Sequence, residues 1–440
     1  DCDARTRWPG VNYFHPRYDN AAGRHARVRS HSKVIMSKRK EFNSPTFAAN
    51  PRFGYLPDND KYLFRNAPPR HAFNVIGVGV NGQEQMLVTL LEGRATIHGV
   101  YDPNPGSIER ARALFAQFAP GQTLKVYATL EEACNEPAID GILIATPNYT
   151  HIDVLRVAVK SGKHILLEKP MATTLADAAE MVGIARDYKA VLQVGLQYRY
   201  KPVYVEAAHE ALSRKSLGDI KTITILEHRM PFLDKVGQWN KFSKFSGGTL
   251  VEKCCHYFDL FNLFAQSRPT RVYATGSQAV NFKDFEYNGE KSDIIDNAFV
   301  DVLYENGVRA NFNLCMFAPM FYEELILCGD EGRLKAWENE EFVAAGRPNS
   351  HLEVMCGLDR PSKISTPMYP DYISKSGHHG GTFAERIAFI DAIEGKPSTA
   401  ATVSEGFWSV VIGIAAETSV KSGQPVVIAD MLAEAGIDLR

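Results

Sequence analysis

A glycine-rich turn between an apolar run and a helical pattern constrains this chain more than any other feature. The apolar stretch 73–76 leads into Gly77-Val78-Gly79-Val80-Asn81-Gly82, and apolar residues with helical spacing follow at Met86, Leu87, Leu90 and Leu91. In a G-x-G-x-x-G turn of this kind, Gly77 permits the tight bend and Gly79 lets the backbone approach a pyrophosphate. Gly82 lets the helix pack closely on the strand. Because the helix N-terminus then faces the phosphate charge, the turn predicts a dinucleotide-binding α/β domain.

An acidic residue at the end of the next predicted strand indicates which dinucleotide is bound. Asp102 lies 20 residues beyond Gly82 and follows the predicted strand 95–101. A carboxylate at this place accepts hydrogen bonds from the adenosine ribose hydroxyls and repels a 2′-phosphate. Pro103 and Asn104 follow, and no arginine is adjacent. We therefore expect the cofactor to be NAD rather than NADP.

The pattern of strands and helices divides the chain. From 73 to 196, strands alternate with helices, which predicts βαβ units and a parallel sheet. Beyond 197 the predicted strands are 221–227, 271–276, 298–304, 308–315, 323–328 and 333–337, and helices are expected over 203–216, 249–264, 382–394 and 404–422. The fold class is therefore α/β. We expect a Rossmann domain at 73–196 and an α+β domain at 197–440, whose open, mainly antiparallel sheet serves substrate binding and oligomerisation.

The first 72 residues differ in charge from the remainder. They carry 14 Lys+Arg against 6 Asp+Glu, whereas the remainder carries 35 against 45. We interpret 1–72 as a basic N-terminal arm. Residues 1–35 are either weakly ordered or non-native, with Met36 as an alternative start. The aromatic segment 41–70 is expected to dock on a surface such as that of a neighbouring subunit; the alternative is a disordered tail.

Composition excludes several classes of protein. The net charge of −2 argues against a nucleic-acid binder, and the chain has no run of about 18 apolar residues that would suggest a membrane span. No signal peptide is visible, although one already removed stays possible. The seven cysteines show neither C-x-x-C nor zinc-ligand spacing: Cys2, Cys134, Cys254, Cys255, Cys315, Cys328 and Cys356. Reduced thiols, a cytoplasmic location and no metal site are expected.

Four further motifs stand in an order that resembles a known family. Thr146-Pro147-Asn148-Tyr149-Thr150-His151 follows the third strand, Glu168-Lys169-Pro170 the fourth, and Gly195-Leu196-Gln197-Tyr198-Arg199-Tyr200 the fifth; the run from Gly247 to Asp259 opens a later helix. From about residue 73 onwards, the chain resembles the Gfo/Idh/MocA family, the group of glucose–fructose oxidoreductase and inositol 2-dehydrogenase. The resemblance implies nicotinamide-dependent redox chemistry on sugars, polyols or their derivatives.

The resemblance also implies roles for individual residues. Lys169 matches the lysine of the Glu-Lys-Pro element, and His256 matches the catalytic histidine. Glu252 stands where inositol dehydrogenases typically carry Asp. The implied cofactor site comprises Gly77, Gly79, Asn81, Gly82, Asp102, Thr146, Asn148, His151, Glu168, Lys169 and Gln197. Weaker candidates for substrate contacts are Tyr198, Arg199, Trp239 and His378.

The chemistry of these residues suits alcohol oxidation. A base must remove the hydroxyl proton, and His256 suits this role because an unperturbed imidazole has a pKa of about 6.5. Glu252 and His256 are i and i+4 on one predicted helix, so the carboxylate is expected to orient the imidazole and support its charged form. Lys169 is expected to hydrogen-bond the reacting oxygen, with its own pKa depressed by burial.

The favoured function is that of an NAD-dependent dehydrogenase of a sugar, glycoside or cyclitol, acting as a homo-oligomer, a dimer or a tetramer. One alternative is a glycoside hydrolase that uses tightly held NAD for transient oxidation. A second is a non-enzymatic NAD-binding subunit, which becomes preferable if His256 and Lys169 lie far from the nicotinamide.

Overall fold

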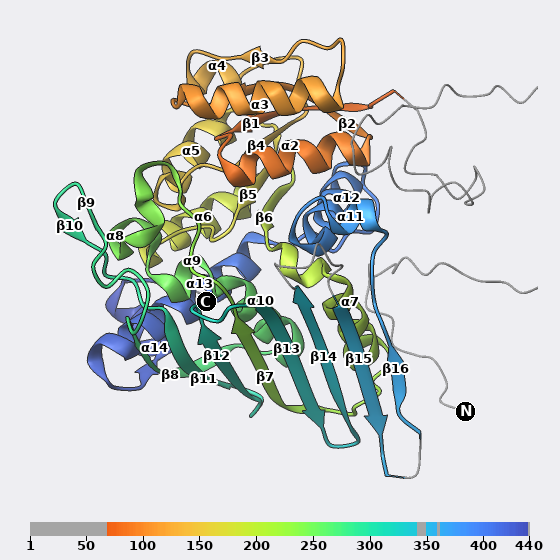
Figure 1. The fold of residues 1–440 in the computed structure, drawn as a ribbon, viewed down its shortest axis with the longest axis vertical. Helices are drawn as coiled ribbons and strands as arrows, with labels where there is room; N and C mark the ends of the chain where they lie inside the picture. The colour runs from red at the N-terminus through yellow and green to blue at the C-terminus, as the bar shows by residue number, and fades with distance from the viewer. Residues whose placement is uncertain (1–67, 341–348, 359–360, 439–440) are drawn as a thin grey trace, which may run out of the picture.

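Six parallel strands form the first sheet of the molecule. The computed structural model describes residues 68–340, 349–358 and 361–438, so the predicted arm at 1–72 lies almost wholly outside the described residues. The sheet has the order β3-β2-β1-β4-β5-β6 (Figure 1). Its strands are β1 (His71–Ile76), β2 (Ala95–Tyr101), β3 (Lys125–Val126), β4 (Gly141–Ile144), β5 (His164–Glu168) and β6 (Leu192–Gly195). This order belongs to the doubly wound fold, which binds dinucleotides where the order reverses, between β1 and β4.

Helices cover both faces of this sheet. They are α2 (Val80–Glu92), α3 (Pro105–Phe118), α4 (Leu130–Cys134), α5 (His151–Ala158) and α6 (Leu175–Asp187). On β1, Phe73 and Val75 belong to the core that includes Leu90 of α2, whereas Ile76 belongs to the core that includes Leu155 of α5. Because both faces of the strand are buried, β1 is a continuous apolar run rather than an alternating one.

A nine-stranded sheet forms the second part, in the order β16-β15-β14-β13-β7-β12-β11-β8-β17. Its strands are β7 (Ile220–His228), β8 (Pro269–Ser277), β11 (Asn297–Tyr304), β12 (Arg309–Cys315), β13 (Phe321–Gly329), β14 (Gly332–Glu340), β15 (Asn349–Cys356), β16 (Lys363–Ser365) and β17 (Val426–Val427). The predicted, mainly antiparallel sheet is confirmed. The exception is the β7–β12 pair, which is parallel because β7 inserts between β12 and β13. The sequence pattern did not predict β15 and β16.

Helices cover one face of the second sheet: α7 (Pro202–Ala208), α10 (Cys255–Ala265) and α13 (Val403–Ser422) (Figure 1). Burial alternates accordingly along β11, where Val300 is buried and Phe299 is 56% exposed. The remaining short elements are η3 (Asn148–Thr150), η4 (Val159–Ser161), η5 (Gln197–Tyr200), η6 (His209–Ser213), η7 (Val236–Lys241), α8 (Ser243–Ser246), β9 (Glu286–Tyr287), β10 (Glu290–Lys291), α11 (Asp371–Ser374), η8 (His378–Gly380) and α14 (Ile428–Glu434).

The C-terminal helices join the two sheets. Helix α12 (Gly381–Ile393) packs on α2, and its Phe389 and Ile390 belong to the same core as Phe73. Helix α13 packs on both α6 and α10. Helix α12 was assigned from sequence to the second domain, but it contributes to the core of the first. It therefore lies beside α2, the helix that follows the glycine-rich turn.

The predicted helix over 249–264 is wrong in one respect, because it is interrupted. Helix α9 covers Thr249–Glu252 and α10 begins at Cys255. At the break, the N–H of Cys254 donates to the carbonyl of Thr249 at 3.4 Å, five residues back, so the turn is wider than an α-helical turn. The intervening Lys253 is buried.

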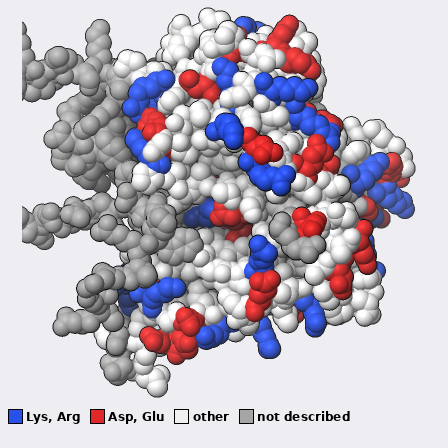
Figure 2. All heavy atoms as spheres, turned by 180° about the vertical axis from the view of Figure 1, so that it is seen from behind, with Lys and Arg blue, Asp and Glu red and all other residues white. Residues whose placement is uncertain are grey.

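Surface and composition features of the described residues complete the description. Acidic and basic side chains are interspersed on the face opposite to the view of Figure 1 (Figure 2). Within the described ranges, none of the helices has the length and apolar character needed to cross a bilayer. The same residues include no group of three or more His, Cys, Asp or Glu side chains that is suited to a metal ion, and their six cysteines are unpaired.

Candidate functional site

The glycine-rich turn lies between β1 and α2, at the carboxyl end of the first sheet. Gly77 has a φ of +83°, and a Cβ placed on it would lie 2.8 Å from backbone atoms of Ala145 and Thr146. A Cβ on Gly82 would lie 2.0 Å from the carbonyl oxygen of Gly77. A Cβ on Gly79 would meet no described atom within 4 Å. Packing therefore requires Gly77 and Gly82, whereas Gly79 faces open space where a phosphate can approach the backbone.

Asp102 follows β2, and its carboxylate hydrogen-bonds the backbone of the glycine-rich turn. One carboxylate oxygen accepts a hydrogen bond from the N–H of Val78 at 2.8 Å, and the other accepts one from the N–H of Asn104 at 2.8 Å. The N-terminus of α2 carries no side-chain cap at Gly79. This arrangement fits a pyrophosphate at the helix N-terminus and an adenosine ribose at Asp102.

Two buried polar atoms near the carboxyl ends of β4 and β6 also fit a dinucleotide. Within the described part of the chain, Nδ2 of Asn148 and Oε1 of Gln197 have no hydrogen-bond partner. An unsatisfied buried polar group costs about 1–3 kcal/mol, so a ligand that pairs with it is favoured. Asn81 lies half-buried in the first turn of α2. The residues present therefore fit NAD, with Asn148 and Gln197 on the side toward the second sheet.

His151 has a positioning role that differs from the expected cofactor contact. Its imidazole is fully buried, with Nδ1 2.9 Å from the carbonyl oxygen of Pro170 and Nε2 3.0 Å from that of Thr146. Burial lowers the pKa of His151 to about 4, although the two backbone hydrogen bonds oppose the shift. His151 thus ties the loop after β4 to the Glu-Lys-Pro element after β5.

The Glu-Lys-Pro element turns two charged side chains into the interior. Glu168 accepts a hydrogen bond from Nε2 of Gln85 at 2.6 Å, and burial raises its pKa. Nζ of Lys169 donates to the backbone carbonyl of Glu252 at 3.2 Å. The expected depression of the Lys169 pKa is wrong: burial lowers it, but the negative charges of Glu252 and Glu168 outweigh burial and the pKa is raised. Lys169 is therefore a charged hydrogen-bond donor.

His256, from the first turn of α10, is 1% exposed and lies flat against the ring of Tyr198. Nδ1 of His256 has no hydrogen-bond partner among the described residues. Burial, followed by the positive charges of Lys169, Lys253, His378 and Lys201, lowers the pKa of His256 well below its ordinary value. The imidazole is therefore uncharged at neutral pH, which is the form that accepts a proton.

Glu252 does not orient His256 as the helical spacing suggested, because α9 ends between them. Oε1 of Glu252 instead accepts a hydrogen bond from Nζ of Lys235 at 3.2 Å. Burial raises the pKa of Glu252, but Lys235 and Lys169 outweigh burial and lower it to about 2. The structure therefore does not show the expected support of a charged imidazole by this carboxylate. Instead, the carboxylate of Glu252 pairs with Lys235, and its backbone carbonyl accepts a hydrogen bond from Lys169.

Two adjacent substrate candidates differ in placement. Tyr198 is buried beside His256, and its hydroxyl lies 2.5 Å from Nζ of Lys253. Arg199 instead forms a two-pronged ion pair with Asp259, at 3.0 Å and 2.5 Å, and a further ion pair with Glu405 at 2.9 Å. Its guanidinium is therefore committed to holding α10 against the start of α13, which disagrees with the expected substrate contact.

The other two candidates border the site from opposite sides. Trp239, in η7, is buried with the ammonium of Lys235 4.6 Å from its ring centre and the ring of Tyr149 6.4 Å away. His378, in η8, lies 6.1 Å from His256 between ring centres, and its Nδ1 is 2.7 Å from Oε1 of Glu84. The structure thus brings His378 close to His256 and Trp239 close to Lys235.

The sequence patterns missed three charged residues at this site: Glu84, Lys201 and Lys253. Nζ of Lys253 lies 3.0 Å from Oε1 of Glu227, and Nζ of Lys201 lies 3.8 Å over the ring of Tyr198. Lys253 lies inside the run from Gly247 to Asp259, but nothing in that run singles it out, and Glu84 and Lys201 belong to no motif. A lysine or glutamate is ordinarily a solvated surface charge. Only the tertiary packing of the chain places these three side chains at this site.

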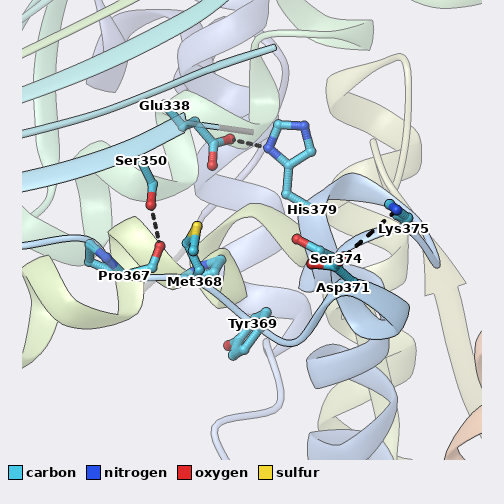
Figure 3. Close-up of a pocket in the computed structure, with 10 residues that line it drawn as sticks. Glu338, Ser350, Pro367, Met368, Tyr369, Asp371, Ser374, Lys375 and His379 are labelled. Atoms are coloured by element: carbon cyan, nitrogen blue, oxygen red, sulfur yellow. Dashed lines mark hydrogen bonds and ion pairs between the residues drawn. The ribbon is translucent and has the colours of Figure 1, made fainter. Parts of the chain in front are cut away.

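A pocket is bordered by His379 of η8 (Figure 3). Its lining includes Pro202, Ser350, Met368 and Tyr369, together with Glu338 and His379. Oε1 of Glu338 lies 2.9 Å from Nδ1 of His379 and accepts a hydrogen bond from Nζ of Lys201 at 2.6 Å. Figure 3 shows the His379 imidazole pointing to Glu338, whereas the adjacent His378 contacts Glu84. The two histidines of η8 therefore serve different surroundings.

Known proteins resemble this chain over most of its length. Inositol 2-dehydrogenase of Rhizobium meliloti (strain 1021) is 25% identical over 81% of this chain and 99% of its own length. 1,5-anhydro-D-fructose reductase of Ensifer adhaerens is 23% identical over 80% of this chain and 97% of its own. A solved oxidoreductase from Agrobacterium radiobacter, in complex with NAD⁺, L-tartaric acid and magnesium, has a TM-score of 0.67 and 17% identity, covering 82% of this chain and 99% of that chain.

Two family descriptions account for most of the described residues. Residues 72–196 match the NAD-binding Rossmann fold of the Gfo/Idh/MocA oxidoreductase family, and residues 209–428 match the C-terminal alpha/beta domain of that family. The matched ranges coincide with the two sheets and with the glycine-rich turn, Lys169 and His256. The chain therefore belongs to the Gfo/Idh/MocA family of oxidoreductases, and its first domain is an NAD-binding Rossmann domain.

Proposed function

We propose that this protein oxidises a secondary alcohol of a sugar, glycoside or cyclitol with NAD, and catalyses the reverse reduction. The observation that carries the proposal is the joint burial of Lys169 and His256 at the carboxyl end of the Rossmann sheet. Lys169 exerts the largest charge effect on the imidazole of His256. The substrate class is supported by the relatives named for an inositol and an anhydro-sugar.

NAD, when bound, supplies the hydride acceptor. His256 is uncharged and accepts the proton of the substrate hydroxyl. Lys169 is charged and donates a hydrogen bond to the reacting oxygen, which stabilises the negative charge that develops there. The carbonyl of Glu252 holds Lys169, and its carboxylate holds Lys235 at the edge of the site.

The remaining assignments belong to the same proposal. The cofactor is held by Gly77, Gly79, Gly82, Asn81, Asp102, Asn148 and Gln197, with Thr146, His151 and Glu168 positioning the loops, and Tyr198, Trp239 and His378 border the substrate. Asp102 favours NAD over NADP. We further propose that the protein forms a homo-oligomer through the open sheet. We also propose a cytoplasmic location, which is supported by the absence of disulfides among the six cysteines of the described residues.

Formation of NADH from NAD, measured across inositols, monosaccharides and glycosides, tests the function. The same assay is applied to the variants His256→Asn and Lys169→Met. We expect NADH from at least one polyol with the natural chain and a strong loss in both variants. Cleavage of an aryl glycoside without net NADH would instead support the hydrolase alternative. NAD binding without turnover on any substrate would support the non-enzymatic subunit.

A further inference from the structure

The proposed base must lose its proton in every turnover, and its surroundings do not provide a direct route. His256 is 1% exposed, and after burial the largest effects on its pKa come from three lysines, Lys169, Lys253 and Lys201, and from His378 when that residue is protonated. A proton held there is disfavoured by both burial and charge. A second group must therefore receive the proton and pass it to water.

His378 is placed to be that group. Its ring centre lies 6.1 Å from that of His256 and 5.9 Å from that of Tyr198. The His378 side chain is 26% exposed, in contrast to His256. Two imidazoles at this separation can exchange a proton through one water molecule. His378 therefore connects the buried reaction centre with solvent.

A carboxylate of the cofactor-binding helix fixes His378 in orientation. Oε1 of Glu84 lies 2.7 Å from Nδ1 of His378, and the hydroxyl of Thr382 donates to the same oxygen. Burial raises the pKa of Glu84, but the charge of His378 and the hydrogen bonds from His378 and Thr382 outweigh burial and lower it. Because Nδ1 of His378 is engaged by the carboxylate of Glu84, the other ring nitrogen, Nε2, is the atom that can receive a proton.

We propose that His378 is a proton-relay residue, positioned by Glu84, that carries the proton from His256 to solvent. The relay rests on the proposed function, since His256 must first take the proton of the alcohol. Only a proton moves: it leaves His256, bonds to Nε2 of His378 and passes to water or to a buffer base. The electron pair of the substrate C–H bond follows the separate path to NAD.

The loop that carries His378 offers a matched control. His378 and His379 have left-handed backbone conformations, with φ of +43° and +54°. Asn adopts this region more readily than most residues, so His378→Asn and His379→Asn preserve the backbone equally well. His379 contacts Glu338 in the pocket that Figure 3 shows. His379→Asn therefore reports the effect of a His-to-Asn change in this loop while the proposed relay residue, His378, is kept.

The decisive measurement is turnover against buffer concentration with saturating polyol and NAD. In dilute bulky buffer, His378→Asn should turn over at least about 100-fold more slowly than the natural chain, the lower end of what a positioned proton-transfer group contributes. Added imidazole, a small base, should restore most of the lost turnover, and the rate should reach a plateau as the imidazole concentration rises. His379→Asn should depend on buffer as the natural chain does. Full turnover of His378→Asn without imidazole overturns the relay.

A second measurement does not depend on activity. Nitrogen NMR of the imidazoles reports which ring nitrogen carries the proton, and we expect Nδ1 of His378 to carry it in the natural chain but not in Glu84→Gln. A proton on Nε2 of neutral His378 in the natural chain overturns the geometry. Full activity of His256→Asn overturns the proposed base, whereas loss in His256→Asn combined with buffer-independent His378→Asn overturns the relay alone.

Discussion

The imidazole of His256 lies parallel to the ring of Tyr198, with ring centres 3.8 Å apart and an angle of 12° between the planes. Nδ1 of His256 has no hydrogen-bond partner among the described residues, and the ring of Tyr198 covers one face of the imidazole. The hydroxyl of Tyr198, in turn, lies 2.5 Å from Nζ of Lys253. A tyrosine ring thus contacts His256, where contact with the carboxylate of Glu252 was expected.

Replacing this ring should therefore lower turnover. An aromatic pair contributes about 0.5–1.5 kcal/mol, which corresponds to about 2- to 12-fold, so Tyr198→Leu should reduce kcat by at least that factor. Tyr198→Phe keeps the ring and loses only the bond to Lys253, so its kcat should fall less. Steady-state kinetics on the best polyol compares the two. Equal kcat values for Tyr198→Leu and the natural chain would show that the stack does not position His256.

Asp102→Ala should weaken NAD binding and reduce discrimination against NADP. Loss of hydrogen bonds to a charged acceptor costs about 1.5–3 kcal/mol, or about 10- to 150-fold in Kd. Asp102 also accepts the N–H of Val78, so Asp102→Asn, which keeps an acceptor oxygen, serves as the control for the turn. Calorimetric titration with each cofactor measures both effects. Unchanged affinity and preference in Asp102→Ala would contradict the ribose assignment.

His256→Asn and Lys169→Met should lower turnover far more than NAD affinity. A positioned acid or base contributes about 10²–10⁴-fold to the rate. Because both side chains act on the same oxygen and its proton, the double variant should lose less than the product of the two single losses. Single-turnover kinetics together with NAD titration separates chemistry from binding. Independent, multiplicative losses would indicate two separate roles.

Arg199→Gln should reduce stability rather than substrate recognition. The Arg199 side chain is 8% exposed and that of its partner Asp259 is 1% exposed. Breaking a buried ion pair by removing one partner costs about 3–5 kcal/mol in the free energy of unfolding. Chemical denaturation measures this loss, and kinetics below the melting temperature measures KM. A KM that rises sharply in a stably folded Arg199→Gln would restore the substrate contact predicted from sequence.

Glu417 should make stability depend on pH. It accepts the N–H of Leu250 in α9 at 2.9 Å, and burial raises its pKa to about 7 despite this hydrogen bond. Between the unfolded value of 4.5 and about 7, the folded chain holds a proton that the unfolded chain has lost. The Glu417 contribution to the free energy of unfolding therefore falls by about 3 kcal/mol as pH rises through this window.

The matched variant isolates this contribution from other titrating groups. Glu417→Gln keeps an acceptor for the N–H of Leu250 and cannot ionise. Denaturant unfolding of both proteins at acid and neutral pH gives the difference between them. The natural chain should lose stability relative to Glu417→Gln as pH rises, and an unchanged difference would contradict burial of the carboxyl.

The sequence by itself determined the architecture and predicted which residues bind the cofactor. Gly77, Gly79 and Gly82 act through their own backbone, and Asp102 ends a strand whose neighbour follows from βαβ winding. These features are encoded within about 30 contiguous residues, so the spacing along the chain carries the geometry. The alternation of strands and helices over 73–196 likewise predicted the parallel sheet, and the successive strands predicted beyond 197 indicated the second, mainly antiparallel sheet.

The tertiary structure alone decided how the reaction centre is built. The interruption of the helix before Cys255 separated Glu252 from His256, although their spacing favoured contact. Glu84 and His378 meet across 294 residues of chain, and neither lies in a motif that predicts a partner. Charge and stacking depend on which residues share a buried space, and long-range packing, rather than local periodicity, brings these side chains together.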